Sequence, residues 1–117
     1  MAADISRIIE IEGFIAGCLV DADTGLMLTS QGGGGADLEI VCQCNARALA
    51  ATVEANQAQG ISDPVEDVVV STGTHVQIIR PLSKGEGLFL FVAVDLAKTK
   101  LGVARLQVAA IERDLEF

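Results

Sequence analysis

The chain has 117 residues, the length of one domain, and we expect residues 1–117 to form a single unit. Half of its residues are hydrophobic but only 3% are aromatic, so aliphatic side chains must build the core. The net charge of −8, with no basic stripe and no aromatic platform for bases, argues against a nucleic-acid partner.

The first quarter of the chain predicts a short helix followed by a β-hairpin. Ile5, Ile8 and Ile9 have helical spacing, which predicts a helix over residues 3–11 that ends at Gly13. Apolar residues 14–20 predict a strand, residues 21–25 (DADTG) a turn, and residues 26–30 the returning strand.

A long helix is predicted from the N-cap Asp37 to about Gln57, with Gly60 as its stop. The predicted helix has two apolar stripes rather than one. The first would face a sheet and contains Leu38, Val41, Cys42, Leu49, Thr52 and Val53. The second consists of smaller residues and predicts a close contact with another backbone, although alanine could be present for helix propensity alone: Ile40, Cys44, Ala48, Ala51 and Ala55. A surplus of apolar surface of this kind is a first indication of a homo-oligomer.

The second half predicts three strands and a closing helix. Residues 65–72 and 74–80 read as a hairpin around Gly73, and Pro81 ends its second strand. Residues 88–94 are apolar on both faces, as in a central strand covered from both sides, and a last helix begins near Thr99. Hairpins with short connections indicate an antiparallel sheet, and amphipathic helices must cover it, so the fold class is α+β.

The DADTG turn and the glycine run Gly32–Gly35 both resemble ligand motifs and fail when they are compared closely. An EF-hand loop starting at Asp21 needs glycine at its sixth position and glutamate at its twelfth, and both are missing. A phosphate loop needs a lysine after its glycines, whereas Ala36 and Asp37 follow here. We therefore interpret the acids as backbone caps of a turn and the glycines as a flexible connection.

The cysteines and the single histidine predict no catalytic or metal site. Cys42 and Cys44 stand two apart on a helix, so their side chains point about 200° apart and cannot share one ion. Cys18 would be a third thiol, but buried thiols acting as small hydrophobes are the favoured reading. His75 has no serine or cysteine motif beside it. We expect no cofactor, no metal, no enzymatic activity and a reducing, cytoplasmic location. We also expect no direct membrane insertion, because residues 88–94 are the longest apolar run.

Taken in order, these segments resemble the Roadblock/LC7 family over nearly the whole chain. The resemblance lies in IEGFIAGCLVDADTGLMLTS, DLEIVCQCNARALAATVEA, VEDVVVSTGTHVQIIRP and GLFLFVAVDLAKTKLGVARLQVAAIERDL. Glu12 departs from the pattern, since many members have proline before the glycine. The resemblance implies a profilin-like, three-layer fold. Its five-stranded sheet has the order 2-1-5-4-3, with the long helix on one face and both terminal helices on the other.

The resemblance also implies a function. Family members are regulators or scaffolds of Ras-like GTPases, or light chains of dynein motors, and bacterial members often work with a GTPase of the gliding-motility type. A homodimer would form through antiparallel long helices and self-paired edge strands. Its interface would contain the small-residue stripe with Val68 and Val70, while Glu39, Gln43 and Arg47 are candidates for partner binding. The alternatives are a dimeric assembly subunit or a small-ligand sensory module, neither with a GTPase partner.

Overall fold

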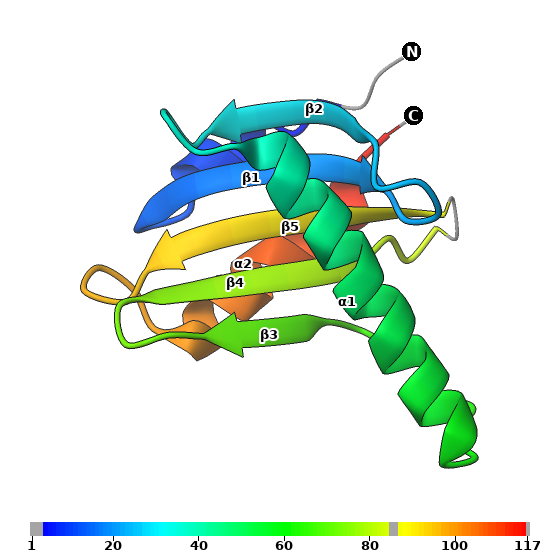
Figure 1. Ribbon diagram of the computed structural model, residues 1–117. Coiled ribbons are helices and arrows are strands. Elements are labelled where there is room, and N and C mark those ends of the chain that lie inside the picture. Colours follow the sequence, from blue (N-terminus) through cyan, green and yellow to red (C-terminus); the bar gives the residue numbers. More distant parts are fainter. Residues whose placement is uncertain (1–3, 85–86, 117) are drawn as a thin grey trace.

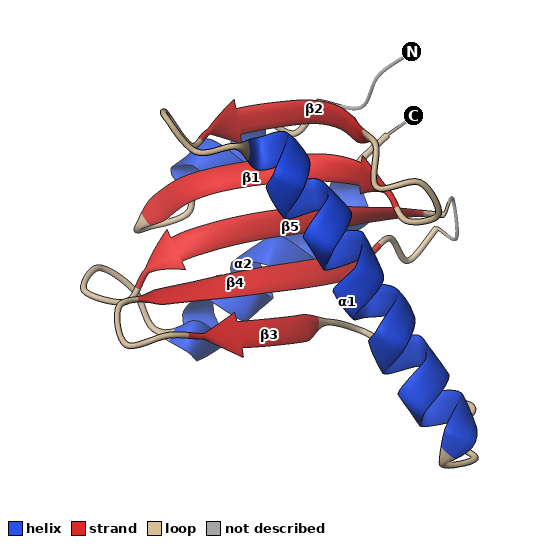
Figure 2. Ribbon diagram, in the orientation of Figure 1, coloured by secondary structure: helices blue, strands red, loops and turns tan. Residues whose placement is uncertain are grey.

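The computed structural model describes residues 4–84 and 87–116, which form one antiparallel five-stranded sheet between helices (Figures 1 and 2). The strand order is β2-β1-β5-β4-β3, so the order that the family resemblance implied is confirmed. Every neighbouring pair of strands is antiparallel. The strands are β1 (Phe14–Asp21), β2 (Met27–Gly32), β3 (Val68–Ser71), β4 (His75–Pro81) and β5 (Leu88–Asp95).

Helices cover both faces of the sheet. The long helix α1 (Leu38–Ala58) crosses one face diagonally, and the 3-10 helix η1 (Ser6–Glu10) and α2 (Leu101–Asp114) lie on the other (Figure 1). The predicted α+β architecture is therefore correct. Within the described residues, no helix combines the length and hydropathy needed to cross a bilayer.

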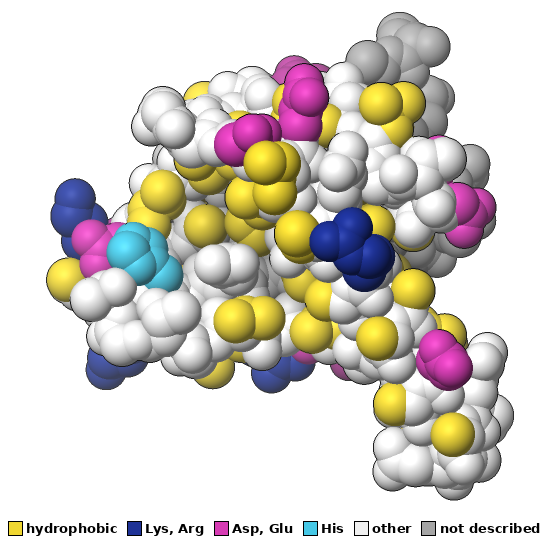
Figure 3. Space-filling view, viewed as in Figure 1, with side chains coloured by type: hydrophobic (Ala, Val, Ile, Leu, Met, Phe, Trp, Pro, Cys, Tyr) yellow, Lys and Arg dark blue, Asp and Glu magenta, His cyan; other side chains and the backbone are white. Residues whose placement is uncertain are grey.

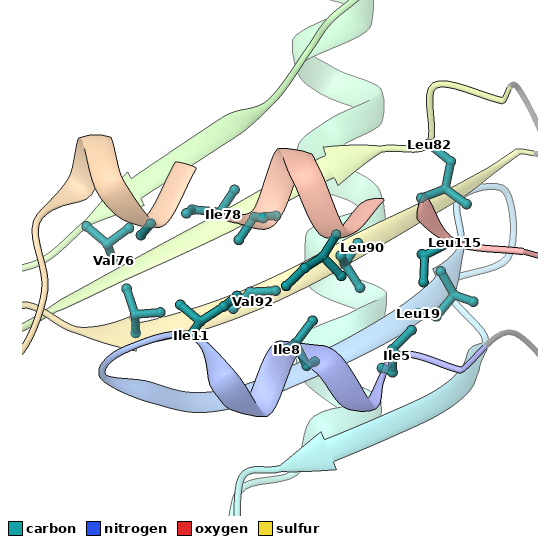
Figure 4. Close-up of a cluster of buried hydrophobic side chains, with 14 residues drawn as sticks. Ile5, Ile8, Ile11, Leu19, Val76, Ile78, Leu82, Leu90, Val92 and Leu115 are labelled. Carbon is teal, nitrogen blue, oxygen red and sulfur yellow. The ribbon is translucent and has the colours of Figure 1, made fainter. Parts of the chain in front are cut away.

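Two separate apolar cores hold the layers together. Under η1 and α2, isoleucines 5, 8 and 11 pack with alternate residues of β1, β4 and β5 and with the buried side of α2 (Figure 4). Gly17 of β1 makes room for η1, because a Cβ there would lie 2.2 Å from Ile8 Cδ1. Under α1, the core contains Cys18, Val20, Cys42, Ala46, Leu49, Ile79, Phe89 and Phe91. Successive strand residues thus alternate between the two cores, as the pleat requires.

The two motifs that resembled ligand sites are turns. Asp21 Oδ1 accepts hydrogen bonds from the backbone amides of Asp23 (2.9 Å) and Thr24 (3.2 Å), so this carboxylate caps its own turn as predicted. Gly25 then has a φ of +74° and lies against Gln43 of α1. In the glycine run, Gly33 donates to Ile15 O at 3.0 Å, and Ala36 donates to Gly33 O at 2.8 Å. The connection that we interpreted as merely flexible is therefore a hydrogen-bonded turn.

Two element boundaries differ from the prediction. The helix predicted over residues 3–11 is a 3-10 helix over Ser6–Glu10 only, and residue 3 lies outside the described part. The strand predicted over 65–72 is limited to Val68–Ser71. Residue 67 leaves the strand pattern because Arg105 of α2 holds the Asp67 carboxylate with two hydrogen bonds, of 2.9 and 3.1 Å.

Candidate interaction surface

Only the first half of α1 rests on the sheet. Its buried residues are Cys42, Asn45, Ala46 and Leu49, all within the first twelve positions of a 21-residue helix. From Ala50 to Ala58 no residue is buried, and the helix continues past β3 beyond the edge of the sheet (Figure 1). A helix of this length is normally stabilised by packing along its whole apolar side. The second half of α1 therefore contributes no buried side chain, and Val53 lines an open cleft with residues 61–65.

The small-residue stripe of α1 lies on one flank of the helix and is open to solvent. Ile40 is 56% exposed, Cys44, Ala51 and Ala55 are exposed, and Ala48 is half-buried. At 100° per residue this stripe lies on the side of α1 away from the buried positions, so it cannot pack against the sheet of its own chain. The structure thus brings together the first five residues that we predicted for a dimer interface.

The sheet beside that flank is also uncovered. An apolar trough of about 430 Å³ lies between the start of α1, the glycine turn and the ends of β1, β4 and β5. Its floor and walls include Ile15, Ala16, Leu38, Val41, Phe91 and Ala93, and His75 and Gln77 are its polar members. The space-filling view shows hydrophobic side chains in a hollow on this face (Figure 3). The end of α1 therefore extends past the sheet, and one apolar region of the sheet has no helix over it.

Strand β3 borders the same face and is an open edge of the sheet. Val70 is 42% exposed, and Val68 is half-buried against the core under α1. Thr72 donates to His75 O at 2.9 Å, and this pairing fixes the alternation along β3. The backbone groups of Val70 and Val68 face β4, whereas those of Val69 and Ser71 point outwards. A further strand added at this edge would form its backbone hydrogen bonds with these two residues.

A buried polar network holds the start of β3 in place. Asp67, next to β3, binds Arg105 of α2 and also lies 3.9 Å from Nη1 of Arg80 on β4. Arg80 Nε donates to the buried Glu112 at 2.8 Å, and Ser83 donates to the same carboxylate from its amide (2.9 Å) and its hydroxyl (2.7 Å). The edge strand is thus tied to α2 through charged groups.

This network also determines the protonation of Glu112. Burial alone would raise its pKa, but the hydrogen bonds from the Ser83 amide, Arg80 and the Ser83 hydroxyl, and the charge of Arg80, outweigh burial and lower it. The network therefore stabilises Glu112 as a carboxylate, the form that pairs with Arg80.

The opposite flank of α1 is polar. Glu39, Gln43 and Arg47, the candidate partner-binding residues, are all exposed. Gln43 and Arg47 line a cleft of about 350 Å³ between α1 and the DADTG turn, together with Asp23 and Thr24. Arg47 Nη2 donates to Cys44 Sγ at 3.3 Å, which places the guanidinium near the outermost line of the helix. Glu39 and Gln43 are therefore separate from the small-residue stripe, whereas Arg47 borders it through Cys44.

The remaining chemical groups lie apart from one another. Cys18 and Cys42 are buried under α1, while Cys44 is exposed on the stripe, so the two helix thiols diverge as expected. His75 Nδ1 lies 2.6 Å from Thr74 Oγ1 at the β3–β4 turn. Among the described residues, no group of three or more histidine, cysteine or acidic side chains is arranged to hold a metal ion.

Sequence reasoning missed two residues of the buried side of α1, Asn45 and Ala46. Ala46 carries no signal, because alanine suits either a buried or an exposed helix position. Asn45 is polar and its Nδ2 has no hydrogen-bond partner among the described protein atoms. Its position one turn after Val41 and one turn before Leu49 was the available indication that it faces the sheet.

Comparison with protein-family models and with curated proteins finds no match. Solved structures do match. Myxococcus xanthus MglB superimposes with a TM-score of 0.79 at 19% identity, over 91% of this chain and 83% of that one. A Roadblock/LC7 domain from Streptomyces avermitilis has a TM-score of 0.80 at 16% identity, over 92% and 88%. An MglB in a tetrameric arrangement has a TM-score of 0.78 at 18% identity, over 93% and 79%.

These likenesses, all below one-fifth identity, establish the fold and confirm the family resemblance at that level. The chain has a Roadblock/LC7-type fold. Its assembly state and its partner are matters for proposal.

Proposed function

We propose that the chain is a non-catalytic, homodimeric regulator or scaffold that binds a small Ras-like GTPase through the outer face of α1. One observation carries the proposal: half of α1 extends past its own sheet while an apolar part of that sheet lies uncovered on the same face. A twofold rotation about an axis perpendicular to the sheet, near β3, would lay each free helix end over the open sheet of the other copy. The interface would contain Ile40, Cys44, Ala48, Ala51, Ala55, Val68 and Val70.

The edge strand limits how two copies can pair. Residues that face each other in an antiparallel pair project to the same side of the sheet. Val68 and Val70 project towards α1, whereas Val69 packs in the other core. The twofold axis would therefore pass beside one residue of β3 that lies opposite its own copy, and Val69 or Val70, in the middle of the strand, would pair the most residues. Either register would satisfy the outward backbone groups of Val69 and Ser71 and would remove an open edge.

The polar flank of α1 would remain accessible in such a dimer and is the proposed GTPase surface. Glu39, Gln43 and Arg47 would contact the partner there, beside the DADTG turn. The GTPase link rests on the resemblance to Roadblock/LC7 proteins. If GTP hydrolysis is accelerated, the effect would come from repositioning the GTPase's own residues, with Arg47 as the testable exception.

The dimer is tested by two neighbouring substitutions on α1. Ala51→Glu places a charge on the small-residue stripe, and we expect light scattering at micromolar concentration to report single subunits. Ala50→Glu is the matched control, because residue 50 is exposed on the polar flank and should leave the dimer intact. A wild-type protein that is well folded and monomeric would overturn the proposal.

The partner is tested by capture from lysate of the source organism on immobilised protein, with GTP or GDP analogues present. We expect a small GTPase whose recovery depends on the nucleotide and falls with Arg47→Ala. Arg113→Ala, on the far face of the molecule, is the control. Recovery of a motor, kinase or membrane complex without a GTPase would favour the assembly-subunit alternative.

A sensory role is the second candidate, and the trough beside the start of α1 is the observation that favours it. At about 430 Å³, with His75 and Gln77 as its polar members, the trough has the size and lining of a small-molecule site. A ligand-dependent rise in melting temperature that is lost in a Gln77→Leu variant would support this reading.

A further inference from the structure

A cleft of about 980 Å³ opens at the edge of the sheet, where β3 stops short of the end of β4 (Figure 1). The first residue of β3, Val68, pairs with Ile79, so the last two residues of β4 have no strand beside them on this side. Residues 63–67 form one wall of the cleft, residues 80–83 form the other, and α1 and Glu112 of α2 complete it. All of these residues belong to one chain, so the cleft does not depend on the proposed dimer.

Arg80 brings free hydrogen-bond donors into this cleft. Its Nε donates to Glu112 at 2.8 Å, whereas its Nη1 lies 3.9 Å from the Asp67 carboxylate, which is too far for a hydrogen bond. Within the described residues, no hydrogen bond involves Nη1 or Nη2, although the side chain is only 14% exposed. The bond to Glu112 therefore holds the guanidinium in place while its outer N–H groups stay available to an acceptor.

The edge of the sheet adds a free acceptor beside these donors. Leu82 N donates to Leu88 O at 3.0 Å, and backbone directions alternate along a strand, so the Pro81 carbonyl points away from β5. If β3 continued, Glu66 would stand opposite Pro81, but no backbone hydrogen bond joins these two residues. The cleft thus presents a donor group and a backbone acceptor on consecutive residues of β4, which is the pairing that a peptide backbone needs.

Charge determines which class of ligand suits the cleft. Four carboxylates line it and two guanidinium groups lie with them, which gives a formal net charge of −2: Asp63, Glu66, Asp67, Glu112, Arg80 and Arg105. Lys84 contacts the Leu115 carbonyl nearby, and counting it still leaves −1. Arginines pair with two of the acids, whereas Asp63 and Glu66 are exposed and form no ion pair within the described residues. The cleft therefore attracts cations to its two unpaired acids.

Two simpler classes of ligand do not fit these observations. A phosphate group or another anion would accept from Arg80, but it would enter a region that already has a net negative charge. A metal ion or a polyamine would suit the unpaired acids, but it has no acceptor for the Nη atoms of Arg80. An extended peptide with basic side chains satisfies both requirements, because each of its residues has a carbonyl and an amide and some carry a cation.

We propose that this cleft binds an extended, basic peptide segment of a partner protein. The carbonyl groups of the segment accept from Arg80, and its amides donate to the Pro81 carbonyl. Its lysine or arginine side chains pair with Asp63 and Glu66. Since successive side chains of an extended segment point to opposite sides, the alternate ones contact apolar wall residues such as Val65.

The experiment uses a fluorescein-labelled hexapeptide of alternating lysine and valine, titrated with the full chain and followed by fluorescence anisotropy. A matched peptide has glutamate in place of lysine. We expect the basic peptide to bind at least about tenfold more tightly, because two favourable contacts at the unpaired acids become two repulsive ones. In nitrogen-15 NMR spectra, the basic peptide should shift the signals of Arg80 Nε–H and the Ser83 amide and leave that of the Gln43 amide unchanged.

Two sets of variants locate the contact. Asp63→Asn with Glu66→Gln should weaken binding of the basic peptide by about fivefold or more. The matched control, Glu12→Gln with Glu54→Gln, removes the same two charges at exposed positions outside the cleft and should bind as wild type does. Arg80→Lys keeps a cation beside Glu112 but loses the planar fork of donors, so it should also weaken binding. If that variant does not fold, the acid pair decides the question.

Three outcomes would overturn the proposal: no binding of either peptide at up to about 1 mM, equal binding of both, or an equal loss in the control pair. Binding that disappears when the protein dimerises would mean that a second copy occupies the cleft, and it would overturn the proposal as well. Light scattering and nucleotide-dependent capture report the proposed function independently, so failure of the peptide site and failure of the proposed function can be told apart.

Discussion

At the scale of single residues, Glu112 is the side chain on which local stability depends most. Its carboxylate is buried and receives three hydrogen bonds, and its cationic partner Arg80 is mostly buried as well. Glu112→Gln leaves the mostly buried Arg80 with only the longer contact to Asp67 at 3.9 Å, which should lower the free energy of unfolding by about 3 kcal/mol. Urea denaturation of wild type and variant at pH 7 measures this difference in the free energy of unfolding.

The pH dependence of that loss follows from the lowered pKa of Glu112. Its contribution is complete above the ordinary pKa of 4.5 and is lost as pH falls through the lower folded-state value. The difference between wild type and Glu112→Gln should therefore shrink below about pH 4. Asp114→Asn is the control, because the Arg7–Asp114 pair is exposed and should contribute no more than about 0.5 kcal/mol. A difference that grows on acidification would contradict this assignment.

The three thiols should differ sharply in reactivity. Burial, then the nearby Cys42 group and the hydrogen bond with it, raise the pKa of Cys18 to about 12, and burial also raises that of Cys42. Thiolate is the reactive form, so neither should react with a disulfide reagent in the folded protein. Cys44 is exposed and should react alone in dilute solution, and Cys44→Ser should remove this reaction. Rapid modification of Cys18 before unfolding would contradict the packing beneath α1.

At the scale of elements, the two halves of α1 should differ in stability. Residues 38–49 are anchored by the sheet, whereas residues 50–58 contain no buried side chain, and short isolated helical segments are marginal in water. Amide hydrogen exchange in residues 52–58 should therefore slow as protein concentration rises and a second copy covers them. Exchange in residues 42–49 should change little. Equal protection in both halves at nanomolar concentration would mean that the free end needs no partner.

The elements also show where sequence reasoning succeeds. The start of α1 was predictable because Asp37 caps it locally, its carboxylate accepting from the Ile40 amide at 3.2 Å. The start of β3 was not, because Asp67 is drawn out of the strand by Arg105, which is 38 positions away in the sequence. The small-residue stripe was predicted from periodicity alone, but the overhang that makes it available was not. The crossing angle of a helix over a sheet has no local sequence signal.

At the scale of the whole molecule, net charge should oppose self-association. The proposed self-contact on the α1 side is apolar, and each copy brings a net charge of −8. Two copies would thus associate despite the electrostatic repulsion between them.

Self-association should consequently become tighter as salt is added. At about 10 mM salt the Debye length is roughly 30 Å, so the acidic groups of two copies repel across the whole dimer, whereas at 150 mM it is about 8 Å and most of that repulsion is screened. Burial of apolar surface is not weakened by this change. Analytical ultracentrifugation from about 10 to 150 mM NaCl should therefore give a falling dissociation constant. If the constant rose instead, the contact would depend on attraction between charges, and the apolar flank of α1 would not be the surface through which two copies meet.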